Sequence, residues 1–170
     1  MITQDDVHEA ALRFFEAVKG RDILVATAES CTGGLVAAAL TNVAGSSANV
    51  DRGFVTYSNE AKIEMLGVSP PTLEAHGAVS AETAREMVEG ALARSRAQLA
   101  VSITGIAGPG GGSETKPVGL VWFAAAAKDG RVDLVERRFG DIGREQVRAR
   151  SVIQALGMLT QLAGGAVRAA

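Results

Sequence analysis

Apolar residues recur along this chain at two spacings, which predict five helices and five strands in mixed order. Between Thr3 and Gly20 they repeat every three or four positions, a pattern typical of an amphipathic helix. Short apolar runs bounded by turn residues predict strands instead. The other predicted helices are 35–42, 60–66, 81–96 and 143–162, and the predicted strands are 23–28, 53–58, 99–104, 118–127 and 132–139.

Polar residues at the starts of the predicted helices indicate how these helices are capped. Thr3 and Asp6 have the pattern of a capping box, in which each side chain satisfies a backbone N–H of the other residue. We expect Asn59 and Ser80 to be the N-caps of the helices that follow them. Three segments are expected to lack regular structure: the loop from Pro70 and Pro71 to Val79, the Gly-rich loop 105–117, and the tail after Ala163, which we expect to fray.

The order of these elements predicts an α/β fold, a three-layer α/β/α sandwich formed by residues 1–170 as a single domain. Helices separate the early strands, which favours parallel crossovers, and a late hairpin adds antiparallel strands. We therefore expect a mixed, mainly parallel sheet of about five strands. Ligands of such sheets bind outside the carboxyl ends of the strands. Polar loops beginning at Glu29, Tyr57 and Thr104 follow three predicted strands, so we expect them to share one cleft.

Composition and charge argue against several classes of function. The net charge of −2 and the absence of a basic stripe disfavour a nucleic-acid partner. The one cysteine excludes an internal disulfide and a cysteine-rich metal site, and it fits a reducing compartment. The polar N-terminus is unlike a signal peptide, and no apolar run reaches the roughly 20 residues of a membrane span, so we expect a cytoplasmic protein without membrane contact. Ala- and Gly-rich helices can pack across a symmetric interface, and we expect a homo-oligomer, a dimer or larger.

The segment Ala28–Gly34, Ala-Glu-Ser-Cys-Thr-Gly-Gly, is the part of the chain whose residues most strongly indicate a reactive or ligand-binding site. It lies between a predicted strand and a predicted helix, so Ser30, Cys31 and Thr32 fall near a helix N-terminus. Backbone N–H groups at such a place can activate a hydroxyl nucleophile or hold an anion. A plain N-cap is the simpler interpretation of a serine there. The paired glycines favour the functional interpretation, because they let a ligand approach the backbone.

A nucleophile in this segment needs a base, and the sequence offers few. Cys31 is a rival nucleophile, but inert packing is the commoner role of a single cysteine. The two histidines do not favour a Ser-His-Asp triad, since His8 falls on the solvent side of a predicted helix and His76 in an unspecific loop. Lys62 can act as a base if burial lowers its pKa, although a solvated surface lysine is its simpler interpretation. Tyr57, the only tyrosine, lies at a strand end where its hydroxyl can reach a substrate or stay exposed.

The Gly-rich loop and the last helix offer places for an anion. Loop 105–112 presents backbone N–H groups suited to phosphate, yet it matches neither the P-loop nor the dinucleotide-binding pattern. Arg144, Arg148 and Arg150 form a solvated face in the simpler interpretation, although one of them can clamp a phosphate. Trp122 lies within an apolar strand and is expected in the core.

Taken together, these segments resemble the CinA carboxy-terminal family, whose members include nicotinamide-mononucleotide (NMN) amidohydrolases. The resemblance spans nearly the whole chain in long, ordered motifs. One departure is the insertion of Ile142 and Gly143 between the Gly-Asp pair and Arg144, after which we favour Arg148 for the family's arginine position. The matching motifs are Ala28-Glu-Ser-Cys-Thr-Gly-Gly34, Gly45-Ser-Ser47, Val55-Thr-Tyr-Ser-Asn-Glu-Ala-Lys62, Leu66-Gly-Val68, His76-Gly-Ala-Val-Ser80, Ile103-Thr-Gly-Ile-Ala-Gly-Pro109, Lys116-Pro-Val-Gly119 and the region from Gly140-Asp141 to Arg148.

The resemblance implies an α/β/α sandwich that hydrolyses the carboxamide of NMN to nicotinate mononucleotide and ammonia, with no metal or other cofactor. Some family proteins carry an additional amino-terminal domain. We expect this chain to be the stand-alone form without that domain, which it resembles. The alternative function is a non-catalytic nucleotide-binding or regulatory module, in keeping with the family's association with competence and DNA damage.

We predict an acyl-transfer site with Ser30 as nucleophile, Lys62 as general base and Tyr57 assisting by hydrogen bonding. Backbone N–H groups within 32–34 or at Gly105 are expected to stabilise the oxyanion, an effect of about 2.7–4 kcal/mol per donor. We expect Thr104 and the Gly-rich loop, with Arg148, to hold the ribose phosphate. The expected substrate-binding residues are Glu29, Cys31, Thr32, Gly33, Gly34, Ser58, Asn59, Thr104, Gly105, Ala107, Gly108 and Arg148.

Overall fold

The computed structural model of the protein, which describes residues 1–165, contains a five-stranded sheet in the order β2-β1-β3-β4-β5. The strands are β1 (Val25–Glu29), β2 (Val50–Val55), β3 (Leu99–Gly105), β4 (Leu120–Ala127) and β5 (Val132–Arg138). The helices of the described part are α1 (Gln4–Val18), α2 (Leu35–Thr41), α3 (Asn59–Leu66), α4 (Pro70–His76), α5 (Ala81–Ala93) and α6 (Arg144–Gly165), with a 3-10 turn η1 (Ser46–Ala48).

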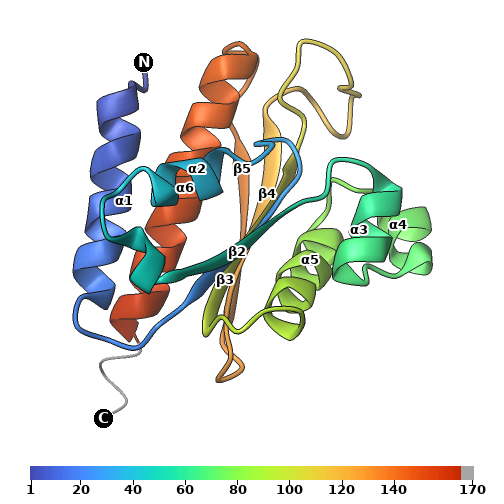
Figure 1. Ribbon diagram of the computed structural model, residues 1–170. Helices are drawn as coiled ribbons and strands as arrows, with labels where there is room; N and C mark the ends of the chain where they lie inside the picture. The colour runs from blue at the N-terminus through green and yellow to red at the C-terminus, as the bar shows by residue number, and fades with distance from the viewer. Residues whose placement is uncertain (166–170) are drawn as a thin grey trace.

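The sheet is the middle of three layers (Figure 1). Helices α1, α2 and α6 cover one face, and α5 covers the other with α3 and α4 beside it. Strand β1 runs parallel to β2 and β3, whereas β4 is antiparallel to both β3 and β5. The α/β/α sandwich with a mixed sheet and a late antiparallel hairpin, predicted from the order of the elements, is therefore confirmed. Each parallel strand directs its carboxyl end to the same edge of the sheet.

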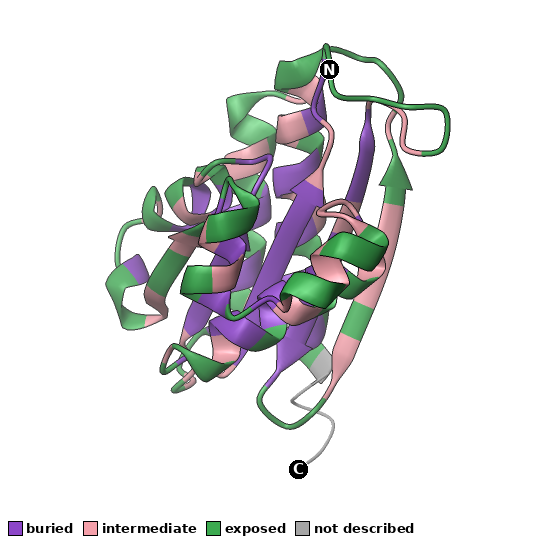
Figure 2. Ribbon diagram, turned by 90° about the vertical axis from the view of Figure 1, so that its right-hand side faces the viewer, coloured by how far each residue is buried: buried purple, intermediate pink, exposed green. Residues whose placement is uncertain are grey.

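Small side chains let the layers pack closely. Figure 2 shows the central strands largely buried, while the edge strand β5 is partly exposed. At the contact between α3 and α5, a side chain on Gly90 would place its Cβ 2.0 Å from the carbonyl oxygen of Leu66. Arg94 donates to the same carbonyl from Nη1, at 2.9 Å. The C-terminal end of α3 is thus fixed on α5, which matters because α3 carries Lys62.

The capping predictions are partly confirmed. Thr3 and Asp6 form the capping box of α1, and the Ser80 hydroxyl caps α5 by accepting from the N–H of Thr83. The prediction for Asn59 is wrong by one residue. Ser58 is the N-cap of α3, and its Oγ accepts a hydrogen bond from the N–H of Ala61 at 3.0 Å.

The predicted loop from 70 to 79 is wrong, because its first part is helix α4. Pro70 occupies the first turn, where a missing N–H costs nothing, and the Ser69 side chain caps the helix. Other boundaries differ as well: β1 begins at Val25 rather than 23, β2 is Val50–Val55 rather than 53–58, α5 ends at Ala93 rather than 96, and β4 begins at Leu120 rather than 118. The predicted fraying after Ala163 is wrong for 164–165, which continue α6, and the rest of that tail lies outside the described residues. No helix within residues 1–165 is long and apolar enough to cross a membrane.

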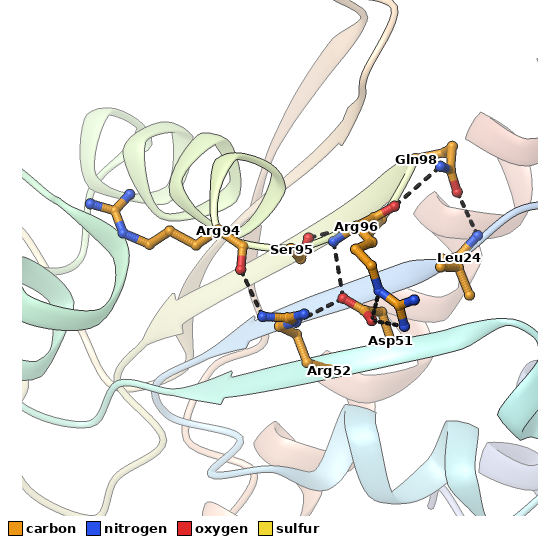
Figure 3. Close-up of polar contacts among 8 residues, drawn as sticks. Leu24, Asp51, Arg52, Arg94, Ser95, Arg96 and Gln98 are labelled. Atoms are coloured by element: carbon orange, nitrogen blue, oxygen red, sulfur yellow. Dashed lines mark hydrogen bonds and ion pairs between the residues drawn. The ribbon is translucent and has the colours of Figure 1, made fainter.

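A charged cluster around Asp51 ties the start of β2 to the segment between α5 and β3 (Figure 3). Arg96 donates to the Asp51 carboxylate from its backbone N–H at 3.0 Å and from its guanidinium at 2.9 Å, and Arg52 donates from Nε at 2.7 Å. These hydrogen bonds, first the one from the Arg96 backbone, lower the pKa of Asp51 to about 2. Because its side chain is only 2% exposed, this carboxylate is a structural anchor at the end of the sheet where β1 and β2 begin.

Asp51→Asn should therefore lower the free energy of unfolding at pH 6 by up to about 2 kcal/mol, the value of a pKa lowered by nearly two units. The sign follows from the lowered pKa of the folded state. The stabilisation is complete above the pKa of the unfolded chain, near 4, and is lost as the pH falls toward 2. Urea unfolding should show the difference between wild type and Asp51→Asn shrinking by about half between pH 6 and pH 3. A difference independent of pH would contradict this role.

Candidate active site

Three loops meet at the carboxyl ends of β1, β2 and β3 and enclose a cavity of about 240 Å³. The loop after β1 carries the segment Ala28–Gly34, the loop after β2 leads into α3, and the loop after β3 is the Gly-rich one. The connection from α4 to α5 closes the remaining side. The lining residues are Ser30, Cys31, Tyr57, Asn59, Lys62, Ala78, Val79, Thr104, Gly105, Ala107 and Arg144.

Ser30 and Lys62 form a hydrogen-bonded pair in this cleft. The Nζ of Lys62 lies 3.0 Å from the Oγ of Ser30 and 2.8 Å from the carbonyl oxygen of Thr56, to which it donates. Lys62 is 1% exposed, which excludes the interpretation of a solvated surface lysine. The same short segment fixes both partners, because the N–H of Thr56 donates to the carbonyl of Glu29 at 2.8 Å.

Burial lowers the pKa of the Lys62 amine. Among the described residues, no carboxylate lies within ion-pair distance of its Nζ, so no ion pair offsets the cost of burying an ammonium. A neutral amine has two N–H donors and one lone pair. One N–H can serve the Thr56 carbonyl while the lone pair accepts the hydroxyl proton of Ser30. This is the arrangement that a general base requires.

Ser30 is not a helix cap, so that simpler interpretation of the serine is wrong. The N-cap position of α2 is Gly34, at φ 100° and without a side-chain hydrogen bond. The helix N-terminus is capped instead by the carboxylate of Glu29, whose oxygens accept from the N–H groups of Val36 at 2.9 Å and Ala37 at 3.0 Å. The anion expected at this N-terminus is thus supplied by the chain itself.

Glu29 is 0% exposed and lies beneath the turn, out of reach of a ligand, although we expected it to bind substrate. Its carboxylate links the end of β1 to the start of α2, so the intervening turn is held from both sides. Gly33 and Gly34, both at positive φ, make this turn sharp enough to present Ser30 to the cleft. Glu29 is therefore a positioning residue for the serine.

Cys31 does not fit the role of nucleophile. It is 6% exposed, and burial raises the pKa of its thiol to about 12. At neutral pH it is a thiol and not the thiolate that attacks carbonyl carbons. Its backbone is better placed than its side chain. Within the described residues the N–H of Thr32 has no acceptor and that of Cys31 contacts only its own thiol, whereas that of Gly33 donates to the Ser30 carbonyl.

The arginine of the cleft is Arg144, the first residue of α6. It donates from Nη2 to the Tyr57 hydroxyl at 3.0 Å and from Nη1 to the Gly108 carbonyl at 2.9 Å. Arg148, which we favoured, does not line the cavity. One turn further along α6, its Nη2 donates to the Thr32 carbonyl at 3.1 Å, behind the serine turn. Arg150 is exposed and lines a different groove, between β5 and α6.

Comparison with known proteins identifies the family. The sequence profile of the CinA C-terminal domain matches residues 7–163. The chain belongs to the CinA C-terminal domain family. The nicotinamide-nucleotide amidohydrolase PncC of Enterobacter agglomerans is 52% identical over 91% of this chain and 94% of its own length, and PncC of Escherichia coli K12 is 50% identical over 94% and 96%. The solved competence/damage inducible protein CihA from Agrobacterium tumefaciens superposes with a TM-score of 0.91 at 57% identity, over 92% of this chain and 95% of that one.

In this CinA domain the remaining predicted residues take different places. Asn59, Thr104, Gly105 and Ala107 line the cleft, while Ser58 caps α3. The Thr104 hydroxyl donates to the Ala78 carbonyl at 2.8 Å, so it holds the α4–α5 connection in place.

Several residues lie elsewhere than the sequence pattern indicated. His76 lies outside the cleft and its Nδ1 faces Glu82 at 3.7 Å. Trp122, expected in the core, is only half-buried. Ala78 and Val79 form an apolar wall that sequence reasoning missed, although their position directly before the Ser80 cap of α5 could have indicated it.

Proposed function

We propose that this CinA domain hydrolyses the carboxamide of NMN to nicotinate mononucleotide and ammonia. The observation that carries the proposal is the contact of 3.0 Å between Ser30 Oγ and the buried Nζ of Lys62, on the floor of a cleft. A serine beside an amine whose pKa is lowered by burial is suited to acyl transfer from an amide. Relatives that match the full length of the chain at about half identity are nicotinamide-nucleotide amidohydrolases, which supplies the substrate.

The first half of the reaction forms an acyl-enzyme. Lys62 takes the proton of the Ser30 hydroxyl as Oγ attacks the carboxamide carbon, giving a tetrahedral intermediate. The backbone N–H of Cys31 follows the nucleophile directly and donates to no other residue within the described part of the chain, so it is suited to donate to the oxyanion. The Lys62 ammonium then returns the proton to the amide nitrogen. The C–N bond of the carboxamide breaks, ammonia leaves, and the nicotinoyl ester on Ser30 remains.

The second half repeats these steps with water. Lys62 takes a proton from water, the hydroxide attacks the ester carbon, and Ser30 leaves with the proton that Lys62 returns. The carboxamide and one water thus become a carboxylic acid and ammonia. Tyr57 lies beside this site, where its hydroxyl, held by Arg144, can donate to the substrate.

Arg144 is the residue that we infer to bind the phosphate. Its guanidinium reaches from the start of α6 to the rim of the cleft, where the Gly108 carbonyl and Tyr57 hold it. An arginine fixed in this way offers further N–H donors to a phosphate. Thr104 is less suited to this role than we expected, because its hydroxyl is already bonded to Ala78.

Ammonia release tests this function directly. We expect the purified protein to release one ammonia per NMN and to act at least about a hundredfold less efficiently on nicotinamide riboside, which lacks the phosphate that the Arg144 guanidinium would hold. The alternative, a non-catalytic nucleotide-binding module, predicts NMN binding without ammonia. Binding of NMN by calorimetry together with no ammonia release would favour that alternative.

A further inference from the structure

The cleft is lined by basic and neutral side chains only. Of the described residues that line it, Lys62 and Arg144 carry basic groups, and none is Asp or Glu. The buried acid nearest in the sequence, Glu29, is 0% exposed and bonded to the N-terminus of α2. The acids that flank the cleft in the sequence, Glu60 and Asp141, are exposed and do not line the cavity.

NMN brings two charged groups of opposite sign to this cleft. Its phosphate is complementary to Arg144, but its pyridinium ring is a cation, and a cation held by a protein is normally matched by a carboxylate or an aromatic face. The lining residues provide no carboxylate and one aromatic ring, that of Tyr57. Tyr57 is 62% exposed and its hydroxyl is engaged by Arg144, so its ring offers an open face at the rim of the cleft.

Stacking on an aromatic ring barely distinguishes charged from uncharged heterocycles. Heteroaromatic rings of any kind stack on a tyrosine face, and at an exposed site the additional attraction for a cation amounts to a factor of about five at most. Ala78 and Val79, which also line the cleft, are apolar and provide contact that does not depend on charge. The guanidinium of Arg144 is directed to the Tyr57 hydroxyl and the Gly108 carbonyl, and the amine of Lys62 to Ser30 and Thr56, so the groups left to contact the ring respond little to its charge.

We propose that the cleft recognises the phosphate and the carboxamide of its substrate, and that its affinity does not depend on the positive charge of the ring. This inference rests on the proposed function and names the substrate class more widely, as 5′-phosphorylated ribosides of heteroaromatic carboxamides, charged or neutral. The ring charge acts in the chemical step instead. An electron-poor pyridinium makes the carboxamide carbon more electrophilic, so a neutral ring is bound equally well and hydrolysed more slowly.

Reduced NMN, whose dihydropyridine ring is uncharged, is the matched probe, and nicotinamide riboside, which keeps the ring charge and lacks the phosphate, is its counterpart. We expect calorimetry on Ser30→Ala to give dissociation constants for NMN and reduced NMN within about fivefold of each other, and much weaker binding of the riboside. In the wild type, reduced NMN should inhibit ammonia release from NMN competitively, with an inhibition constant close to the KM of NMN.

A dissociation constant for reduced NMN at least tenfold above that of NMN, with the same trend in its inhibition constant, would overturn the inference. It would show that a carboxylate reaches the ring, for example from a second copy of the chain. Failure of either nucleotide to bind would overturn it as well. Failure of the proposed function gives a different result, in which NMN and reduced NMN bind alike but the wild type releases no ammonia from NMN.

Discussion

Ser30→Ala should lower kcat for ammonia release from NMN by at least about 10⁴-fold, because no other described side chain in the cleft can replace its hydroxyl as an activated nucleophile. The Ser30 Oγ is the atom that Lys62 Nζ contacts at 3.0 Å. Removing one oxygen leaves the turn intact, since Glu29 and the two glycines define it. The KM, or the dissociation constant measured by calorimetry, should therefore change little. Steady-state ammonia release and binding to the same variant check both expectations.

Cys31→Ala is the matched control, because it removes the neighbouring side chain that sequence reasoning could not exclude as a nucleophile. With a thiol pKa raised to about 12, Cys31 contributes no thiolate at neutral pH, and its backbone N–H survives the substitution. We expect this variant to keep activity within about tenfold of wild type, the small loss reflecting a repacked buried side chain. An inactive Cys31→Ala beside an active Ser30→Ala would show that the mechanism is wrong.

The fold could be predicted because its elements obey local rules. The capping box of Thr3 and Asp6 lies within four residues, the Ser80 cap directly precedes its helix, and the central strands β1, β3 and β4 are largely apolar. Helix α4 is not evident from the sequence because two consecutive prolines also occur at the start of loops. Pro70 after the Ser69 cap is equally compatible with a helix start. The Ser58 cap was missed because Ser58 and Asn59 are both good caps, and only the backbone geometry distinguishes them.

The pairing of Ser30 with Lys62 could be proposed from the sequence, but the sequence pattern alone does not determine it. The two residues are 32 positions apart, and the contact depends on Thr56, Glu29 and the close approach of α3 to α5 at Gly90. No local pattern records such long-range packing.

The positions of Glu29 and Arg144 in the structure differ from expectation for a related reason. In the sequence, a carboxylate next to a nucleophile suggests a group that binds substrate. In the structure, the carboxylate of Glu29 instead accepts hydrogen bonds from the N–H groups at the start of α2. An arginine at the first position of a helix reaches the cleft only because α6 begins there. Which of Arg144 and Arg148 faces the cavity is set by that helix start, and the insertion of Ile142 and Gly143 obscures it in the sequence.

Lys62→Met should lower kcat by about a thousandfold, within the range that removal of a general base produces. The methionine keeps most of the buried length of the lysine but has no lone pair to accept the Ser30 proton. In the wild type, kcat/KM should rise with pH through the pKa of Lys62, which burial places below its ordinary value of 10.5. The pH–rate profile should lose this limb in Lys62→Met. An unchanged profile would show that another group is the base.

The same substitution should raise the free energy of unfolding at pH 7, in the direction opposite to its effect on activity. Because the pKa of Lys62 is lower in the folded protein than in the unfolded chain, the unfolded chain binds the proton of this amine more tightly. The folded protein therefore loses stability as the pH falls below the pKa of the unfolded lysine, and methionine removes this loss.

Lys128→Met is the control, because Lys128 is an exposed lysine between β4 and β5 at the other end of the sheet. This substitution should change neither the activity nor the free energy of unfolding. Urea unfolding of the three proteins between pH 6 and pH 9 should show a stability difference between Lys62→Met and wild type that narrows as the pH rises. A destabilised Lys62→Met would contradict this prediction. It would mean that favourable contacts stabilise the buried ammonium enough to offset its desolvation, and an ammonium cannot accept the proton of Ser30.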